Sequence, residues 1–217
     1  MKVGVIGAGI SGLTFSVAMR RFAPRVQVEL YERDLSPTSR FQGYSLGLKG
    51  DSGIPVLKAI GRYDQIAQHV VTIQNFVFCD QRGQVLLELS ATSDETRLTQ
   101  RVKRNVLKAA LLEAIGETPI HSNMLAKSFE QGDGGVEVQF ENGRTASADY
   151  LVACDGVASA IRQQMIGDQK SYLGLTTILL DSPHLLDHPL LEGGYFLTLG
   201  ENGASLFCYR QQGALSL

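Results

Sequence analysis

The sequence predicts an α/β protein whose first element is a strand of a parallel sheet. Residues 2–31 follow the order strand, glycine-rich turn, helix and strand, and this βαβ order makes the two strands parallel. A β-hairpin pattern at residues 75–89 then interrupts the alternation of helices and strands, and the chain after residue 171 is rich in strand-forming side chains. We therefore expect an α/β domain with an inserted hairpin, followed by the start of a further β-sheet.

Three segments build the opening βαβ unit. The mostly apolar run KVGVI, residues 2–6, ends in glycines, as a buried parallel strand does. Residues 11–22 carry apolar side chains at helical spacing, and Pro24 stops this helix. Residues 26–31, VQVELY, alternate between apolar and polar side chains and predict the second strand.

The middle of the chain mixes loop, helix and hairpin signals. Residues 34–53 are rich in Ser, Gly and Pro and predict a loop, and residues 54–69 predict a helix entered through Pro55. The hairpin strands flank the turn DQRG at residues 80–83. Residues 103–115 give the clearest helical pattern of the chain.

The second half of the chain is dominated by strand patterns. Two strands are expected at residues 125–130 and 135–140, because a glycine-rich turn separates them. Residues 150–154 predict a short apolar strand. Two β-rich runs follow at residues 172–180 and 194–209.

Composition narrows the class of protein. At about 150 residues per domain, 217 residues indicate one large domain or one domain with part of a second, and 44% hydrophobic residues suffice for a packed core. A net charge of −2 without a dense basic run argues against a nucleic-acid partner. Apart from the glycine-interrupted N-terminus, no segment approaches the about 18 apolar residues of a membrane span. The three cysteines are widely spaced, which favours a reducing cytoplasm over a disulfide framework.

A glycine motif stands between the first strand and the first helix. Residues 7–12 read GAGISG, which is the GxGxxG pattern. Its position between a predicted strand and a predicted helix is the one that indicates dinucleotide binding. Gly7 permits the tight turn, Gly9 lets a pyrophosphate approach the backbone, and Gly12 lets helix and strand pack closely. Ile10 and Ser11 open the helix, whose first N–H groups favour phosphate.

An acidic residue follows the second strand. The Glu32 carboxylate is placed to accept hydrogen bonds from a ribose diol, and it would repel a 2′-phosphate. This first site therefore favours FAD or NAD over NADP. A glycine-rich turn without a ligand is the alternative interpretation.

Further motifs make the chain similar to a known family. Glu32-Arg33-Asp34, Arg104 in KRNVL and the run CDGVASAIR together resemble the flavin-dependent aromatic hydroxylases, which include p-hydroxybenzoate hydroxylase, salicylate hydroxylase and the tetracycline-inactivating monooxygenases. The resemblance covers residues 1 to about 180. It implies a Rossmann-like FAD/NAD(P)-binding domain over residues 1–170, with the hairpin at 74–90 on the substrate side, and a partial substrate-domain sheet over residues 171–217.

The resemblance also implies roles for individual residues. The glycine motif and Glu32 bind the ADP half of FAD, and Arg104 contacts the flavin cofactor. The family motif D-G-x-x-S-x-x-R, associated with binding of FAD and NAD(P)H, matches Asp155, Gly156, Ser159 and Arg162. The expected cofactor-binding residues are therefore Gly7, Gly9, Ile10, Ser11, Gly12, Glu32, Arg33, Arg40, Arg104, Asp155 and Gly156.

Two further arginines belong to this set. Arg33 is expected beside the adenine or the ribose, with a surface role as the alternative, and Arg40 matches a position that some tetracycline-inactivating relatives use for the nicotinamide cofactor. The flavin-contacting aspartate of those relatives falls near Gly47, so that contact is absent in this sequence.

Each motif also has a structural alternative. The alternative interpretation of Arg104 and Arg162 is that they are solvated helix residues. The alternative interpretation of Asp155 is that it caps a helix starting near Val157. His184 and His188 have a metal-ligand spacing, but the prolines around them favour an exposed loop, and no metal is expected. Cys154 is expected to be a buried strand residue beside the DG motif rather than a nucleophile.

The family resemblance implies an FAD-dependent monooxygenase. NAD(P)H supplies electrons, O2 supplies oxygen, and the substrate is an aromatic, polycyclic or other electron-rich small molecule; no residue is expected to be catalytic, because the flavin performs the oxidation. The family's later Gly-Asp motif has no match in residues 163–217. We therefore expect a C-terminally truncated form, or a second chain that completes the flavin site.

Two other functions stay open from the sequence. One is an FAD- or ADP-binding remnant or subunit without turnover of its own. The other is an NAD-dependent dehydrogenase of plain Rossmann type, against which the hairpin and the DG motif count.

Overall fold

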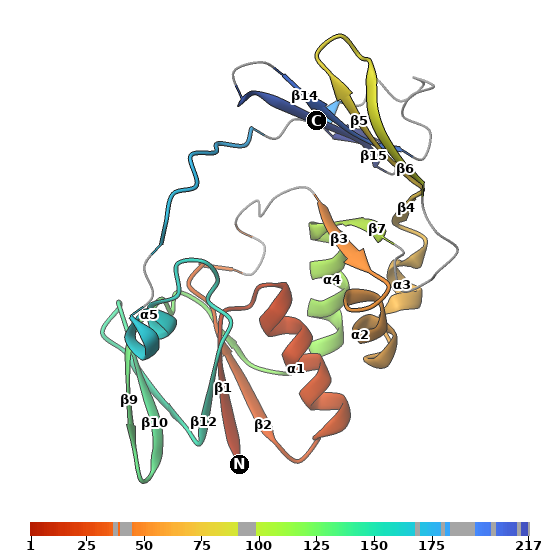
Figure 1. Cartoon of the computed structure of the whole chain (residues 1–217). Coiled ribbons are helices and arrows are strands. Elements are labelled where there is room, and N and C mark those ends of the chain that lie inside the picture. Colours follow the sequence, from red (N-terminus) through yellow and green to blue (C-terminus); the bar gives the residue numbers. More distant parts are fainter. Residues whose placement is uncertain are drawn as a thin grey trace. The chain divides into compact units, whose positions relative to one another are not determined.

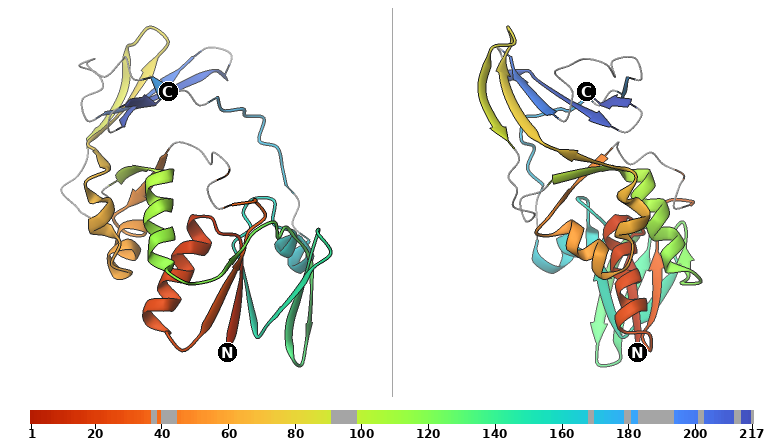
Figure 2. Two further views of the ribbon diagram at one scale, coloured as in Figure 1. Left: turned by 180° about the vertical axis from the view of Figure 1, so that it is seen from behind. Right: turned by 90° about the vertical axis from the view of Figure 1, so that its right-hand side faces the viewer.

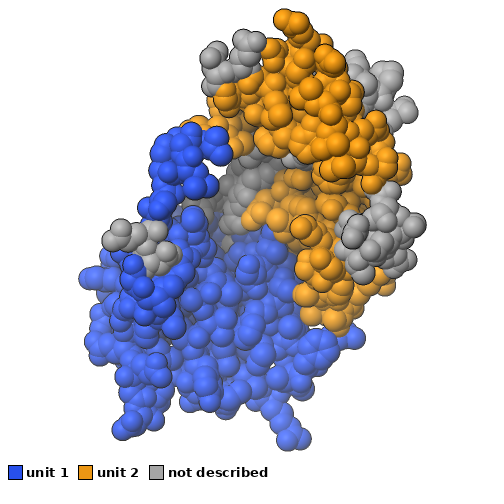
Figure 3. Space-filling model, viewed as in Figure 1, with its two compact units in different colours: residues 1–41, 108–175 blue, residues 42–107, 176–217 orange. Residues whose placement is uncertain are grey.

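The structure is a computed structural model of the 217-residue chain. It describes residues 1–36, 39, 45–90, 99–167, 170–178, 181–182, 194–200, 203–211 and 214–216. Two compact units divide the chain, residues 1–41 with 108–175 and residues 42–107 with 176–217 (Figure 3). Each unit is therefore assembled from two stretches of sequence.

A four-stranded parallel sheet forms the centre of the first unit. Its order is β12 (Tyr150–Ala153), β1 (Lys2–Ile6), β2 (Gln27–Tyr31) and β8 (Ile120–His121). Helix α1 (Ile10–Phe22) connects β1 to β2 and packs on this sheet through buried apolar side chains (Figures 1 and 2). The strand that is buried along almost its whole length is β1, as its apolar sequence predicts.

An antiparallel sheet completes the first unit. Strands β9 (Ala126–Gly132), β10 (Gly135–Phe140) and β11 (Thr145–Ala148) lead into β12, and helix α5 (Ala160–Ile166) follows it (Figure 2). Side chains of both sheets and of α5 share one apolar cluster. Its buried members are Ile6, Tyr31, Met124, Ala126, Val138, Phe140 and Ile161.

The second unit contains a small antiparallel sheet with helices. Strand β7 (Thr99–Lys103) lies between β3 (Ser45–Lys49) and β4 (Val70–Ile73). Helices α2 (Gly53–Ala59) and α3 (Tyr63–Ala67) connect β3 to β4. Helix α4 (Arg104–Ile115) follows β7 directly and runs from this unit into the first unit. Leu48 on β3 and Val102 on β7 are buried.

A six-stranded sheet forms the rest of the second unit. Its central strands β15, β14 and β5 carry aromatic side chains, and β6 lies at one edge. The pairing of β14 with β5 is parallel, and the other pairings are antiparallel. The strands in sheet order are β13 (Asp181–Ser182), β16 (Ala214–Ser216), β15 (Ser205–Gln211), β14 (Gly194–Leu199), β5 (Asn75–Asp80) and β6 (Val85–Ser90).

The predicted α/β class with an opening βαβ unit and an inserted hairpin is confirmed. Three local expectations are wrong. Residues 34–53 contain strand β3, the helix predicted over residues 54–69 is broken where Gly61 has a φ of +69°, and residues 172–178 form no regular strand. In the described part of the chain, no helix is long and apolar enough to cross a membrane.

Candidate functional site

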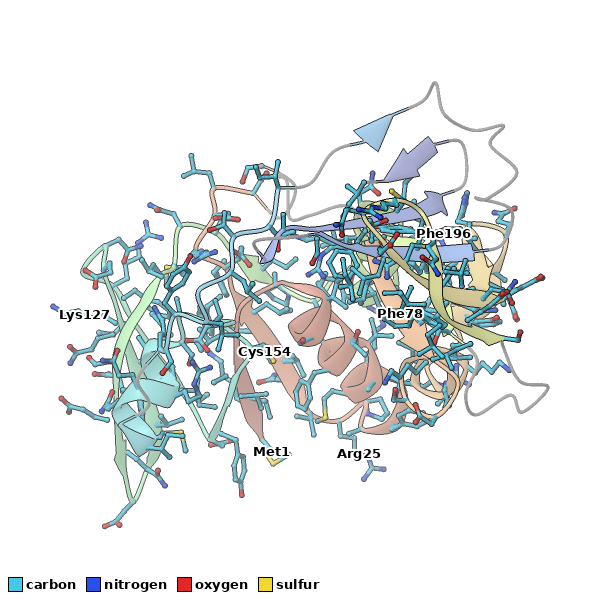
Figure 4. The ribbon with its side chains drawn as sticks, turned by 45° about the horizontal axis from the view of Figure 1, so that its top comes forward. Met1, Arg25, Phe78, Lys127, Cys154 and Phe196 are labelled. Carbon is cyan, nitrogen blue, oxygen red and sulfur yellow. The ribbon has the colours of Figure 1, made fainter. Side chains whose placement is uncertain are left out.

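The glycine turn connects the end of β1 to the start of α1. Gly7 has a φ of +100°, and a Cβ on it would lie 2.5 Å from the carbonyl oxygen of Cys154, which follows β12 (Figure 4). A Cβ on Gly12 would collide with the carbonyl oxygen of Gly7. Among the residues that the structure describes, none has an atom within 4 Å of a Cβ on Gly9. Two glycines are thus required by close packing within the protein, whereas Gly9 faces open space.

The N-terminus of α1 is available to an anion. Gly9 is the N-cap, its backbone is extended, and no side chain caps the helix. No acidic residue lies in the first turn, which includes Ile10 and Ser11. The first N–H groups of a helix lack partners within the helix and carry the positive end of its dipole. This end of α1 has the geometry of a phosphate-binding helix start.

Glu32 holds the glycine turn to the end of β2. Its side chain is buried, and its two oxygens accept hydrogen bonds from backbone N–H groups, Oε2 from Ala8 at 2.7 Å and Oε1 from Asp34 at 3.0 Å. The N–H of Gly7 also donates to the Tyr31 carbonyl at 2.8 Å. The acidic residue picked out in the sequence therefore lies directly against the turn.

Arg33 lies beside this carboxylate in sequence but extends outward. Its Nε is 3.8 Å from Oδ1 of Asp34, and 42% of its side chain is exposed. Arg40, the neighbouring arginine among the expected residues, lies outside the described residues.

The DG motif forms the loop between β12 and α5. Gly156 has a φ of +80°, and the position of a Cβ on Gly7 lies 3.4 Å from Cα of Asp155, so this loop adjoins the glycine turn. The helix begins at Ala160 rather than near Val157, and its cap is the Ser159 side chain, which accepts the Arg162 N–H at 2.9 Å. The alternative interpretation of Asp155 as a helix cap is therefore wrong.

Arg162 fastens the DG loop. Its guanidinium donates to the carbonyl oxygens of Gly156 at 3.2 Å and Val157 at 2.9 Å. Arg162 follows the loop by only a few residues, so these hydrogen bonds are local contacts. The interpretation of Arg162 as a purely solvated helix residue does not describe these contacts.

Cys154 precedes the DG motif and stays a thiol at neutral pH. Burial, together with the negative charge of Asp155, raises the pKa of the Cys154 thiol. Its N–H donates to the Ile6 carbonyl at 2.8 Å, which continues the pairing of β12 with β1. The expectation of a buried strand residue is wrong, because Cys154 is half-buried and lies directly after β12. A protonated thiol held in this way nevertheless fits a structural residue better than a nucleophile.

Arg104 is the first residue of α4, and the second unit contains it. Its Nε is buried and has no hydrogen-bond partner in the part of the chain that the structure describes. A buried donor of a charged group normally has an acceptor, so this atom is consistent with a ligand oxygen.

The described residues hold no candidate metal site. Within the described ranges, no three His, Cys, Asp or Glu side chains gather in a way that would hold a metal ion. His184 and His188 lie outside these ranges.

A cavity in the first unit is separate from these residues. It has a volume of about 930 Å³ and lies between the β9–β10 turn, β12 and α5. None of its lining residues belongs to the glycine turn, and Glu32 is not among them. This cavity is therefore not lined by the residues that the sequence predicts for the cofactor.

The glycine turn, the uncapped helix and the buried acid define the first unit as a dinucleotide-binding α/β domain. Residues 1–190 match the family model of the FAD binding domain, and the chain belongs to this family. Each unit has one feature that is compatible with a cofactor when it is taken by itself: the open space at Gly9 in the first unit, and in the second unit the buried Arg104 Nε, which has no partner among the described residues.

Individual relatives agree with this family. A monooxygenase of Aspergillus candidus, cfoF, is 31% identical over 230 residues, which cover 94% of this chain and 55% of the relative. A flavin-dependent monooxygenase of Legionella longbeachae serogroup 1 (strain NSW150) is 32% identical over 175 residues, covering 79% of this chain and 43% of the relative. The crystal structure of tetracycline destructase Tet(51) is similar with a TM-score of 0.67 and 25% identity, covering 99% of this chain and 55% of that one. The chain thus spans about half the length of the curated relatives it matches.

Proposed function

We propose that the chain is the FAD-binding part of an FAD-dependent monooxygenase. NAD(P)H is its reductant, O2 its oxidant, and an aromatic, polycyclic or other electron-rich small molecule its substrate. The observation that carries the proposal is the glycine turn, in which Gly9 leaves open space at an uncapped helix start while Gly7 and Gly12 are closely packed. The relatives named above support the oxidative chemistry.

The proposed contacts of FAD begin at the glycine turn. The pyrophosphate lies against the backbone of Gly9, Ile10 and Ser11, where the N–H groups and the helix dipole favour its charge. Each Glu32 oxygen accepts one backbone N–H, and a carboxylate oxygen has a second lone pair for a ribose hydroxyl. Arg33 is placed beside the adenine or ribose.

Four other residues have proposed roles toward the cofactors. Arg104 donates to a flavin oxygen, which would satisfy its buried Nε. Asp155 and Gly156 contribute to the FAD and NAD(P)H sites from the loop that Arg162 fastens. Arg40 is proposed as a contact of the nicotinamide cofactor.

Bound FAD supplies the redox chemistry, so the side chains of this chain bind and orient rather than react. For this reason we assign no catalytic acid, base or nucleophile. We place residues 1–170 in the FAD-binding domain and residues 171–217, with the hairpin at 74–90, on the substrate side.

Turnover is proposed for the chain together with polypeptide that completes the flavin site. This polypeptide is either the continuation of a longer protein or a second chain, and the proposal is supported by the half-length match to the relatives. An FAD- or ADP-binding subunit without turnover of its own is the second candidate. The cysteines are odd in number and widely spaced, which supports a cytoplasmic location.

Titration of FAD fluorescence with the protein and two variants tests the cofactor proposal. Gly9→Asp places a good N-cap residue at the start of α1, so the helix gains a few tenths of a kcal/mol, but its charge opposes the pyrophosphate. Gly9→Asn is the matched control, with the same shape and no charge. We expect quenching at micromolar wild-type protein and a loss of affinity of about 100-fold or more in Gly9→Asp, clearly larger than in Gly9→Asn.

Absence of quenching by the wild-type protein, or equal affinity in Gly9→Asp, would contradict the proposal. NADPH and NADH oxidation by the FAD-loaded chain, joined to the polypeptide that completes the flavin site, separates the two candidates. A binding subunit retains FAD and oxidises neither nucleotide.

A further inference from the structure

The chain at the end of β8 holds the backbone of Glu32 from both sides. The N–H of Glu32 donates to the His121 carbonyl at 2.8 Å, and its own carbonyl accepts the N–H of Met124 at 2.8 Å. The N–H of Asn123 also donates to the Asp34 carbonyl at 3.1 Å. The Glu32 side chain is bonded to the glycine turn, so these backbone contacts help to decide where its carboxylate lies.

The pairing at Glu32 contains one extra residue. In a regular parallel ladder, the N–H and the carbonyl of one residue bond to residues that are two apart on the neighbouring strand. The partners of Glu32 are His121 and Met124, which are three apart. Asn123 accommodates the extra residue, because its φ is +60°, the only positive φ of a non-glycine residue in the described part of the chain. Bulges re-aim side chains next to active sites, and backbone strain is concentrated at functional sites.

A side chain from the β10–β11 turn contacts this bulge. Nδ2 of Asn142 donates to the Asn123 carbonyl at 2.6 Å and to Sδ of Met124 at 3.4 Å. Oδ1 of Asn142 accepts the Arg144 N–H at 3.0 Å, so two backbone groups fix the orientation of the amide. Met124 is buried in the apolar cluster of the first unit. Asn123, Met124 and Asn142 are called the asparagine bulge below.

We propose that Asn123 and Asn142 are positioning residues of the ribose site. They act through Glu32, because the asparagine bulge fixes its backbone while its carboxylate lies against the glycine turn with a lone pair for a ribose hydroxyl. The proposal rests on the proposed function, because it concerns the ribose of the same dinucleotide. A bulge that contributes only to the stability of the fold is the alternative that the experiment must separate.

Binding of ADP and of 2′,3′-dideoxy-ADP to the full chain, measured by calorimetry, tests the proposal. The two nucleotides have the same base and phosphates, and only ADP has the ribose diol. Asn123→Val places a β-branched residue at a positive φ, so ADP affinity should fall by about threefold to tenfold, with little change for the dideoxy nucleotide. Asn123→Gly adopts this φ without cost and should bind both nucleotides like the wild type.

Gly167→Val is the matched control for backbone strain in the same unit. Gly167 has a φ of +65° at the end of α5, and among the described residues none has an atom within 4 Å of a Cβ on it. A β-branched residue is strained at this φ as well. The control should therefore lower the urea midpoint and leave the affinity for both nucleotides unchanged.

Asn142→Asp tests the same bulge if Asn123→Val fails to fold. It keeps the oxygen that accepts the Arg144 N–H and replaces the donor to the Asn123 carbonyl by a second oxygen. ADP affinity should fall by about threefold to tenfold, again with little change for the dideoxy nucleotide. A general effect of the new charge would weaken both nucleotides equally, because they carry the same phosphates.

Three results would overturn the proposal and favour a purely structural bulge. They are equal affinity of the wild type for the two nucleotides, equal losses for both, and unchanged ADP affinity in both asparagine variants. FAD titration of the wild-type chain is read separately. FAD binding that does not depend on the asparagine bulge overturns only this inference, whereas ADP binding that depends on it without any FAD binding overturns only the proposed function. Binding of neither FAD nor ADP overturns both.

Discussion

The Glu32 carboxylate accepts a hydrogen bond from the backbone N–H of Ala8 at 2.7 Å, inside the glycine turn. The acid therefore shapes the turn, in addition to the contact with a ribose that we propose for it. A residue assigned to ligand recognition from the sequence also contributes to folding, because its two oxygens satisfy buried backbone donors.

Removal of this carboxylate is expected to lower both stability and FAD affinity. Glu32→Ala leaves the N–H groups of Ala8 and Asp34 without their acceptor, at about 1–3 kcal/mol for each one that water does not reach. Urea unfolding measures the first effect and FAD titration the second. Arg162→Ala, which only loosens an exposed loop, is the comparison, and we expect it to weaken FAD less. Equal losses of FAD affinity would contradict the placement of the ribose at Glu32.

Gly7 and Gly143 both have positive φ, but only Gly7 is closely packed. Gly7→Ala adds a contact of 2.5 Å with the Cys154 carbonyl to the cost of the backbone conformation, so we expect a loss of about 2–4 kcal/mol in the free energy of unfolding. Gly143→Ala meets no atom within 4 Å and should cost about 1 kcal/mol. Chemical denaturation of the two variants measures the difference. Similar losses would show that the close approach of β12 to the turn is unimportant.

The glycine turn was predictable because its signals are local. Gly7, Gly9, Gly12 and Glu32 follow two strands and a helix whose periodicities are visible within residues 2–31, and the parallel pairing of β1 with β2 follows from that order. The DG motif is predicted in another way, through its match to the family motif D-G-x-x-S-x-x-R. The hydrogen bonds of Arg162 with the loop are not predicted, because the motif does not specify where this side chain points.

The second unit was less predictable because its contacts join distant segments. Strand β3 reads as a loop from its sequence and becomes a strand only by pairing with β7, where Leu48 is opposite Gln100. Ser45, Arg101 and Tyr209 carry no motif. They meet only after β3, β7 and β15 are assembled, so no spacing in the sequence indicates their hydrogen bonds.

Glu29 is expected to make stability depend on pH in the acid range. Although burial alone would raise the pKa of Glu29, hydrogen bonds from Lys2, Tyr31 and His121 lower it below its ordinary value of 4.5. A group with a lowered pKa in the folded state contributes stability above the unfolded pKa and loses it as the pH falls through the folded pKa. Urea midpoints measured below pH 5 should therefore fall less steeply in Glu29→Gln than in the wild type. Parallel profiles would contradict the role of this carboxylate, and Glu137→Gln, on strand β10 away from this network, is the control.

Cys154 is expected to react slowly with alkylating reagents although it lies beside the candidate site. Burial and then the charge of Asp155 raise the pKa of its thiol, and only the thiolate attacks iodoacetamide. With Cys79 and Cys208 replaced by serine, alkylation at pH 8 should be slower in the folded chain than in urea, by about tenfold for each unit by which the pKa is raised. Asp155→Asn removes the nearby charge and should speed the reaction of the folded chain, while its rate in urea stays the same. If the folded and unfolded chains react equally fast, Cys154 is an accessible thiolate, and its interpretation as a structural residue fails.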